Sequence, residues 1–260
     1  MNDKPVKQLV PIQSLVVALR ILDALGKMRG PAALSEIARD ARVSPSKLHR
    51  YLATLLSHGY VEQSRQTGRY SLGRGSISLG LRAMRHVDLY ERVNAGLDDI
   101  ATRTGCHSFM SIWTAAGPIV VRWSYSDDGI GVNTMPGQLL SVLRSSSGQI
   151  FAAFLPEIKT ARLIEKEITA IGKDGEYARR LIARVETVRT QRYSTTVGEL
   201  EGHLQSIAVP VFDWHNDWLI AVGCTFDVEE DNERLERTRK ILQDFAANTS
   251  AQPEIALAVE

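Results

Sequence analysis

Apolar residues at helical spacing predict the first element of the chain. Within residues 14–28, Leu15, Leu19 and Leu22 recur at i, i+4 and i+7, and further apolar residues flank them. This stripe indicates an amphipathic helix with the leucines on its apolar face. Ser14 precedes the stripe and is of the residue type that favours an N-cap. The Arg-Gly-Pro stretch that follows ends the predicted helix.

Two further helices follow with almost no connection between them. The spacing predicts a short helix over residues 34–41, capped by Ser35, and another that begins at Ser44 and Pro45. Serine is a favoured N-cap, and proline fits the first helical position because no N–H is missed there. Helices joined by so tight a turn must cross steeply, with Val43 at the corner, which predicts a helix-turn-helix.

The second helix of this pair has an apolar face and a polar face. The apolar face is formed by Leu48, Leu52, Leu55 and Leu56. Pointing the other way are Ser46, Lys47, Arg50 and Thr54. A helix that is basic on its outer side suits the major groove of DNA, where Lys and Arg bind guanine edges or phosphates. A solvated basic face on an ordinary bundle helix is the alternative.

A β-hairpin is predicted directly after this helix. Residues 60–63 and 70–72 have strand-like patterns, with a Thr-Gly turn between them, and Arg65 and Arg69 flank the tip. An arginine-tipped hairpin after a basic helix-turn-helix predicts a wing that lies along phosphates or in a minor groove. The candidate DNA-contacting residues are Ser44, Pro45, Ser46, Lys47, His49, Arg50, Thr54, Arg65 and Arg69.

Charge is unevenly distributed along the 260 residues. The first 80 residues contain 12 Lys and Arg against 5 Asp and Glu, whereas the remainder contains 19 against 25. A basic N-terminal part on an acidic remainder indicates an anionic partner for the N-terminal part alone. We therefore expect double-stranded DNA as its partner.

The rest of the chain alternates helical and strand-like segments. Helices are predicted at residues 75–86, 88–105, 147–155, 157–168, 175–191 and 232–250. Strands are predicted at residues 108–113, 118–125, 139–143, 204–213 and 217–226. This order favours an antiparallel sheet with helices packed on it, which together with the N-terminal helices gives an α+β fold.

A serine-rich stretch before one of these helices is the best candidate for binding a small molecule. Its residues are Arg144, Ser145, Ser146, Ser147 and Gly148. Free N–H groups and the positive end of a helix dipole favour an anion there, and the arginine can pair with a carboxylate. A capped helix without a ligand is the alternative.

Catalysis and metal binding have little support in the sequence. The serines do not form the Gly-x-Ser-x-Gly elbow of a hydrolase, and phosphate-loop and dinucleotide fingerprints are absent. Cys106 and Cys224 lack metal-ligand spacing, so we expect no catalytic residue, no metal and no cofactor. No apolar run resembles a signal peptide or a membrane span, which favours a cytoplasmic protein that does not bind membranes.

The chain resembles the IclR family of bacterial transcriptional regulators over residues 14 to about 245. In the N-terminal part the resemblance rests on "SLVVALRILDAL", "LSEIARDARVSPSKLHRYLATLLSHGYVEQ" and "YSLGRGSISLG". Further along it rests on "GQLLSVLRSSSGQIFAAFL" and "GELEGHLQSIAVPVFD". It implies a winged helix-turn-helix at residues 10–74, a linker helix at 75–87, and a GAF-like or profilin-like effector-binding and oligomerisation domain at 88–252.

The resemblance also implies a mode of action. Such regulators form homodimers or homotetramers, bind near-palindromic operators and respond to a small-molecule effector, commonly a carboxylic acid or an aromatic catabolite. By family position, the residues opposite the serines would be Asp213, Ile220, Cys224 and Phe226. A DNA-binding protein with a purely structural dimerisation domain is the alternative. The sequence leaves open the effector and the choice between repressor and activator, and we take repressor as the working expectation.

Overall fold

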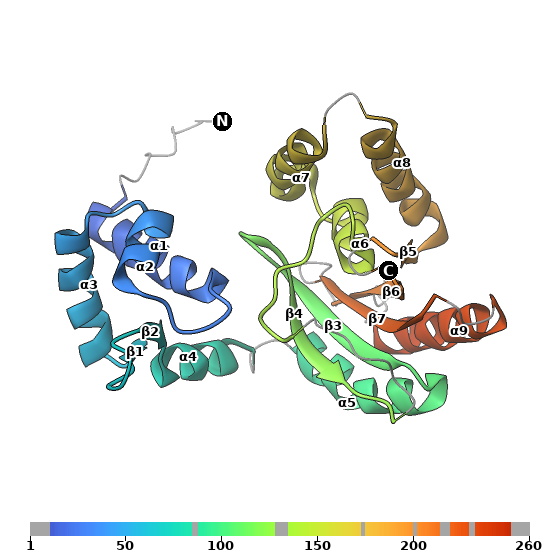
Figure 1. Cartoon of the computed structure of the whole chain (residues 1–260). Helices are drawn as coiled ribbons and strands as arrows, with labels where there is room; N and C mark the ends of the chain where they lie inside the picture. Colours follow the sequence, from blue (N-terminus) through green and yellow to red (C-terminus); the bar gives the residue numbers. More distant parts are fainter. Residues whose placement is uncertain are drawn as a thin grey trace, which may run out of the picture. The chain divides into compact units, whose positions relative to one another are not determined.

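A computed structural model describes residues 11–84, 88–127, 135–172, 175–199, 202–213, 219–228 and 232–250. The contacts divide the chain into two units, residues 1–86 (the head) and 87–260 (the body), and each is described by itself (Figure 1). Within the described ranges, none of the helices combines the length and the hydropathy that a bilayer span needs.

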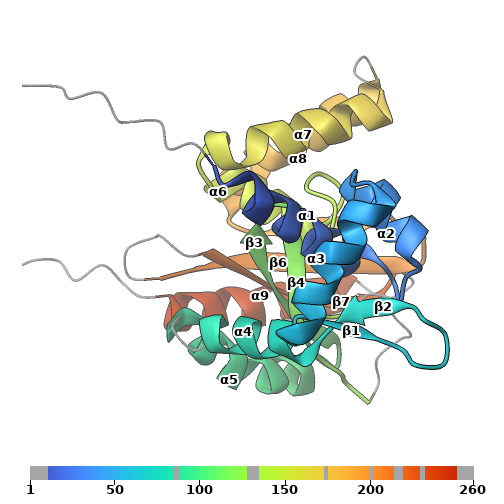
Figure 2. The same cartoon turned by 90° about the vertical axis from the view of Figure 1, so that its left-hand side faces the viewer.

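The head contains the predicted helix-turn-helix and wing. Its elements are α1 (Gln13–Lys27), α2 (Leu34–Ala41), α3 (Pro45–Ser57), β1 (Val61–Gln63), β2 (Tyr70–Leu72) and α4 (Arg74–Met84). β1 pairs antiparallel with β2, and Ala32 adds an isolated bridge to Tyr70. Figure 2 shows the loop of the hairpin projecting away from the helices of the head.

α1 buries a different face from the predicted one. Its buried side chains are Val17, Ile21, Ala24 and Leu25. Leu15 and Leu19 are instead 56% and 53% exposed. Because α1 has apolar residues on two faces, its packing against α2 and β2 decides which of them is buried. The predicted cap is also wrong, since Ser14 lies inside the helix and Ile12 holds the N-cap position.

Backbone geometry and one carboxylate determine the ends of α2. Arg42 adopts a left-handed conformation, with φ of 52°, that ends the helix, and Val43 is buried at the corner as predicted. Ala33, rather than Ser35, holds the N-cap position. The N–H of Ala33 donates to the carboxylate of Glu36 at 2.6 Å, which satisfies a helix-start donor from within the helix.

The body is an antiparallel sheet with helices packed on it, as predicted, and the helices cover both faces. Its helices are α5 (Asp88–Thr104), α6 (Ser146–Phe154), α7 (Glu157–Ile171), α8 (Glu176–Gln191) and α9 (Asn232–Thr249). Its strands are β3 (His107–Thr114), β4 (Gly117–Ser124), β5 (Ser194–Val197), β6 (Leu204–Phe212) and β7 (Leu219–Asp227), in the order β4-β3-β7-β6-β5. Figure 1 shows α5 and α9 on one face of the sheet and α6, α7 and α8 on the other.

Two strands differ from the prediction. Residues 139–143 form no strand, because Leu139 makes only an isolated bridge to Ile119 before the chain turns. β5, which was not predicted, is a short polar segment that pairs with β6 at the edge of the sheet. Its serine and threonines have no apolar alternation, so only its pairing with β6 makes it a strand.

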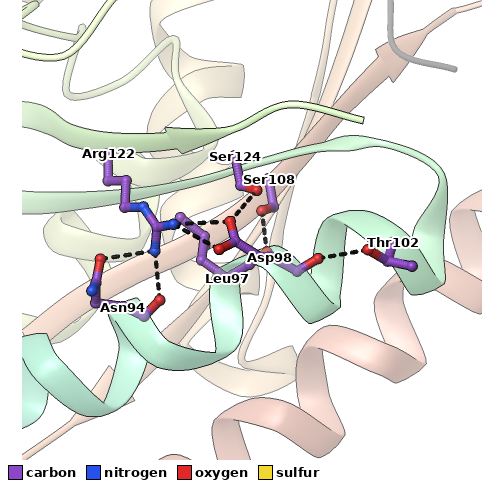
Figure 3. Close-up of polar contacts among 7 residues, drawn as sticks. All are labelled: Asn94, Leu97, Asp98, Thr102, Ser108, Arg122 and Ser124. Carbon is purple, nitrogen blue, oxygen red and sulfur yellow. Dashed lines mark hydrogen bonds and ion pairs between the residues drawn. The ribbon is translucent and has the colours of Figure 1, made fainter. Parts of the chain in front are cut away.

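Polar contacts fasten the edge strand β4 to α5 (Figure 3). Nη1 of Arg122 donates to the backbone and side-chain oxygens of Asn94, at 2.5 and 2.8 Å. Nη2 of Arg122 donates to both carboxylate oxygens of Asp98 at 2.9 Å, and the hydroxyl of Ser124 donates to the same carboxylate at 2.5 Å. The hydroxyl of Ser108 on β3 reaches the same helix through the carbonyl of Leu97, at 2.7 Å.

We expect this network to make stability depend on pH in acid. The hydrogen bond from Ser124, and then those from Arg122, hold the pKa of Asp98 below its ordinary value. The contribution is therefore complete above the unfolded-state pKa of about 4 and is lost as the pH falls toward the folded-state pKa. Asp98→Asn should flatten the acid limb of urea-measured stability by a small amount, because the side chain is 68% exposed. Asp99→Asn is the control, and equal acid limbs in wild type and Asp98→Asn would contradict the prediction.

Candidate nucleic-acid interface and small-molecule site

The outer face of α3 gathers the polar residues that the sequence singles out. Leu48 and Leu52, which are 0% and 1% exposed, hold the opposite side of the helix in the core of the head. An open hollow on the outer face is lined by Ser46, Lys47, Arg50, Tyr51 and Thr54. Half-buried Tyr51 was missed because its position in the sequence lies beside the leucine stripe. A hollow with two cations and several hydroxyls can accept phosphates or base edges.

Four other predicted contacts lie around this face or on the hairpin. Ser44 holds the N-cap position of α3 without a side-chain cap, and its Oγ lies 3.5 Å from Oγ of Ser46. Pro45 begins the helix, and His49 is exposed on it. Arg65 is exposed in the turn of the hairpin. All four are therefore accessible from solvent.

Arg69 has a partner within the head. Its Nη1 donates to the carbonyl of Pro31 at 3.1 Å and lies 3.4 Å from Oε2 of Glu36, at the start of α2. The contact ties the hairpin to α2. Because the two side chains are 49% and 41% exposed, the ion pair itself stabilises the fold little. The sequence predicts a phosphate contact for Arg69, and the structure adds this competing role.

We expect Arg69→Ala to weaken binding to a selected duplex and to a random duplex alike. Loss of one cation should flatten the slope of log K against log salt by about one ion. Glu36→Gln, which removes the competing carboxylate, should strengthen binding to both duplexes. Fluorescence anisotropy over a salt series measures both effects. A loss confined to one DNA sequence, or weaker binding by Glu36→Gln, would contradict the assignment.

The serine stretch begins α6, as predicted. Several of its hydroxyl and N–H groups already make hydrogen bonds within the chain. Ser145 is the N-cap, and its Oγ accepts the N–H of Gly148 at 2.9 Å and donates to the carbonyl of Ser141 at 2.6 Å. The hydroxyl of Ser147 donates to that of Ser111 on β3 at 3.1 Å. Ser145 and Ser147 are 2% and 0% exposed, so this helix start faces the sheet rather than solvent.

A row of polar side chains crosses the sheet beneath α6. Oγ of Ser146 lies 2.8 Å from Oγ of Ser206 on β6. Ser206 is in register with Thr196 on β5 and with Thr225 on β7, and Thr225 is in register with His107 on β3. Cross-strand partners point to the same face, so the polar row Thr196–Ser206–Thr225–His107 faces α6. Thr196, Thr225 and His107 are each 5% exposed, and buried polar groups under a helix start are suited to a polar ligand.

Three residues predicted to lie opposite the serines are on the other face of the sheet. Ile220, Cys224 and Phe226 are buried in the core formed with α5 and α9. The prediction is wrong because consecutive strand residues face opposite sides, so an offset of one residue exchanges the faces. Thr225, between two of these residues, faces α6. Burial raises the pKa of the Cys224 thiol well above its ordinary value, which suits a core residue.

Arg144 and Asp213 lie in different surroundings. Nη2 of Arg144 donates to the backbone oxygen of Glu199, and its Nε is buried without a partner in the described residues. The Glu199 carboxylate accepts hydrogen bonds from the hydroxyl of Tyr177 and, at 2.8 Å, from Arg184. Burial, and then the bond to Glu199, raise the pKa of Tyr177. Asp213 follows β6, roughly 20 Å along the strand from the polar row, so it lies far from the serines at the start of α6.

Metal ligation finds no support in the side chains that the structure places. Within the described ranges, no group of three or more His, Cys, Asp or Glu residues is arranged to hold a metal ion. The candidate sites consist of cations and hydroxyls on α3, and of buried hydroxyls with one histidine on the face of the sheet that α6 covers.

Known proteins combine the same two units. The family model for the IclR helix-turn-helix domain matches residues 14–65, and the model for the bacterial transcriptional regulator IclR C-terminal domain matches residues 81–251. The HTH-type transcriptional regulator XynR of Escherichia coli (strain K12) is 24% identical over 246 residues, which are 89% of this chain and 93% of XynR.

Solved structures share the fold. An IclR transcriptional regulator from Alicyclobacillus acidocaldarius matches with a TM-score of 0.78 and 27% identity, over 93% of this chain and 98% of that one. An IclR homolog from Microbacterium hydrocarbonoxydans, solved with 4-hydroxybenzoate, matches with a TM-score of 0.74 and 19% identity, over 91% of this chain and 97% of that one. The relatives of this chain are regulators rather than enzymes, as the sequence predicts. The chain belongs to the IclR family of bacterial transcriptional regulators.

Proposed function

We propose that this regulator places α3 in the major groove of a near-palindromic operator and rests its hairpin on the flanking phosphates. A small-molecule effector bound in the body changes the affinity for that operator. The observation that supports the DNA-binding half is the outer face of α3, where Lys47 and Arg50 are exposed while Leu48 and Leu52 anchor the helix. The first mode of action to test is repression in the bacterial cytoplasm, in which the protein dissociates from its operator when the effector binds.

Selection from a randomised duplex library tests the DNA-binding half. The enriched duplex should be bound at least about 10³-fold more tightly than a shuffled duplex of the same composition at physiological salt. Both complexes should weaken steeply with added salt, because phosphate contacts release counterions. If the full chain binds no duplex in dilute buffer, with or without candidate metabolites, the proposal fails.

The proposed operator symmetry needs two copies of the head. Two apolar strips on the head are exposed to solvent and can join such copies. Each of the following side chains is more than half exposed: Leu15 and Leu19, four residues apart on α1, and Ile77 and Leu81, four residues apart on α4. Burial of these strips against a second copy removes apolar surface from water. We infer a homodimer joined through α1 and α4, with pairs of dimers forming homotetramers.

The effector that best fits the body is a small carboxylic acid or aromatic catabolite. The polar row supplies hydroxyl and imidazole groups, and Arg144 supplies a buried Nε–H without a partner in the described residues. Phe109 and Trp123 lie beside the row on the same face, with ring centroids 5.1 Å apart. Apolar rings next to a few placed polar groups are typical of small-molecule sites. The 4-hydroxybenzoate bound by the Microbacterium relative is of this class.

A pair of adjacent substitutions tests the effector site. A thermal-shift screen of carboxylic and aromatic acids should first identify a ligand that stabilises the wild type. Thr225→Val, on the α6 face, should then weaken the binding of that ligand at least about tenfold, because a buried hydrogen bond is lost. Its operator binding should be unchanged. Cys224→Ala, on the opposite face, should leave ligand affinity unchanged. Equal losses in both variants would contradict the site, and a screen without any ligand favours a purely structural body.

A further inference from the structure

A carboxylate of α7 occupies the turn that precedes α6. The Glu167 carboxylate accepts hydrogen bonds from the hydroxyl of Ser141 at 2.7 Å, from the N–H of Val142 at 2.6 Å and from the N–H of Leu143 at 2.9 Å. Two successive backbone N–H groups and a hydroxyl thus converge on one anion. This is the geometry of an anion-binding nest, with the charge supplied by the chain itself.

The turn is joined to both α6 and the sheet. The N–H of Arg144 donates to Oγ of Ser141 at 3.0 Å, and Oγ of Ser145, the N-cap of α6, donates to the Ser141 carbonyl at 2.6 Å. On the other side, the N–H of Leu140 donates to the carbonyl of Pro118 on β4 at 2.8 Å. A carboxylate in this turn therefore holds together α7, the start of α6 and an edge strand.

Few side chains of α7 are deeply buried in the core. Thr160 is its one fully buried residue in the described chain, and its apolar side chains Leu163, Ile164 and Ile168 are only partly buried. Ile158 is 91% exposed. The three hydrogen bonds to Glu167 are thus a substantial part of what fixes this helix, since hydrogen bonds to a charged group are stronger than neutral ones.

We propose that the turn Ser141–Leu143 is a carboxylate-binding site and that Glu167 is its built-in ligand. Tethering gives the Glu167 carboxylate an effective concentration that free acids in solution do not match. Glu167 therefore closes the site to free carboxylates while it positions the start of α6.

This occupancy has a consequence for effector binding, which rests on the proposed function. The N–H groups of Val142 and Leu143 are taken by Glu167, and that of Gly148 is taken by Ser145. A carboxylate effector is then recognised by the polar row and Arg144 rather than by this turn. Glu167 is a positioning residue for that site and does not contact the effector.

Removing the tethered carboxylate should open the turn to a free one. Glu167→Ala should lower the Tm of the full chain by roughly 3–8 °C. Sodium formate should recover part of that loss beyond the effect of sodium chloride at the same concentration, whereas the two salts should act equally on the wild type. The readout needs neither DNA nor effector, so its failure is distinct from failure of the proposed function.

Glu165→Ala is the matched control, because it removes an exposed carboxylate from the same helix. It should show no recovery specific to formate. If Glu167→Ala is unfolded at room temperature, formate must restore its near-ultraviolet circular dichroism where chloride does not. Equal action of formate and chloride on Glu167→Ala, or equal stability of Glu167→Ala and the wild type, overturns the proposal.

Discussion

Arg50→Ala should weaken binding to the operator by about 1–3 kcal/mol and relax the preference for one base pair. Arg50 is exposed on α3 and lines the same hollow as Ser46 and Lys47, while the buried Leu48 and Leu52 keep the helix in place. Loss of its side chain therefore removes a contact to DNA without removing a contact of the core. Anisotropy titrations with the selected duplex and its single-base variants measure both effects.

Two further variants separate charge from base recognition. Arg50→Lys keeps the cation and loses the planar fork, so it should recover affinity for random DNA and not the discrimination between bases. Arg29→Ala removes a cation from an exposed loop of the head and should weaken binding far less. If Arg50→Ala binds the operator as tightly as the wild type, α3 does not read DNA through this residue.

Gly148→Ala should destabilise the body by about 3 kcal/mol, the upper end of the usual cost of overpacking. A Cβ at this position would lie 2.1 Å from the carbonyl oxygen of Ser141 and 2.5 Å from that of Val142. Both are backbone atoms, so no side chain can rotate away, and the turn and α6 must separate. The same turn contains the hydrogen bonds to Glu167, which such a shift would lengthen.

Urea unfolding monitored by tryptophan fluorescence measures this loss. Gly202→Ala is the control, because a Cβ there would meet nothing within 4 Å, and its stability should stay within about 0.5 kcal/mol of the wild type. Equal urea midpoints for Gly148→Ala and Gly202→Ala would contradict the prediction. They would show that the turn moves away from a Cβ at position 148 at little cost in stability.

Regular spacing within single elements was enough to predict most of the fold. The inward residues of α5, which are Leu89, Val93, Leu97 and Ile100, are buried as predicted. On α3, Leu48 and Leu52 are buried and Leu55 and Leu56 are partly buried against the same core. In each case the apolar residues mark only one face of a helix, so helical periodicity identifies the buried side without knowledge of any neighbour.

The candidate sites were predictable only in part, for reasons of register and partnership. Serines 145–147 were found because they lie at the start of a predicted helix, a local signal. Thr225 and Ser206 were not found because the face of a sheet that a strand residue occupies depends on its register with the neighbouring strands. Arg69 was predicted as a free cation, and its bond to Glu36 joins residues 33 positions apart. Glu167 lies 25 positions from Val142, and the pattern within neither segment predicts their contact.

By itself the sequence determined the helix-turn-helix, the wing, the helices and the strands β3, β4, β6 and β7 of the body, and the basic face of α3, because each depends on spacing within one segment. Only the tertiary structure decided which face of α1 is buried, which strand residues face α6 and which carboxylate fills the turn before it. Those outcomes depend on what packs against a segment from elsewhere in the chain, and the pattern within that segment does not contain its partner.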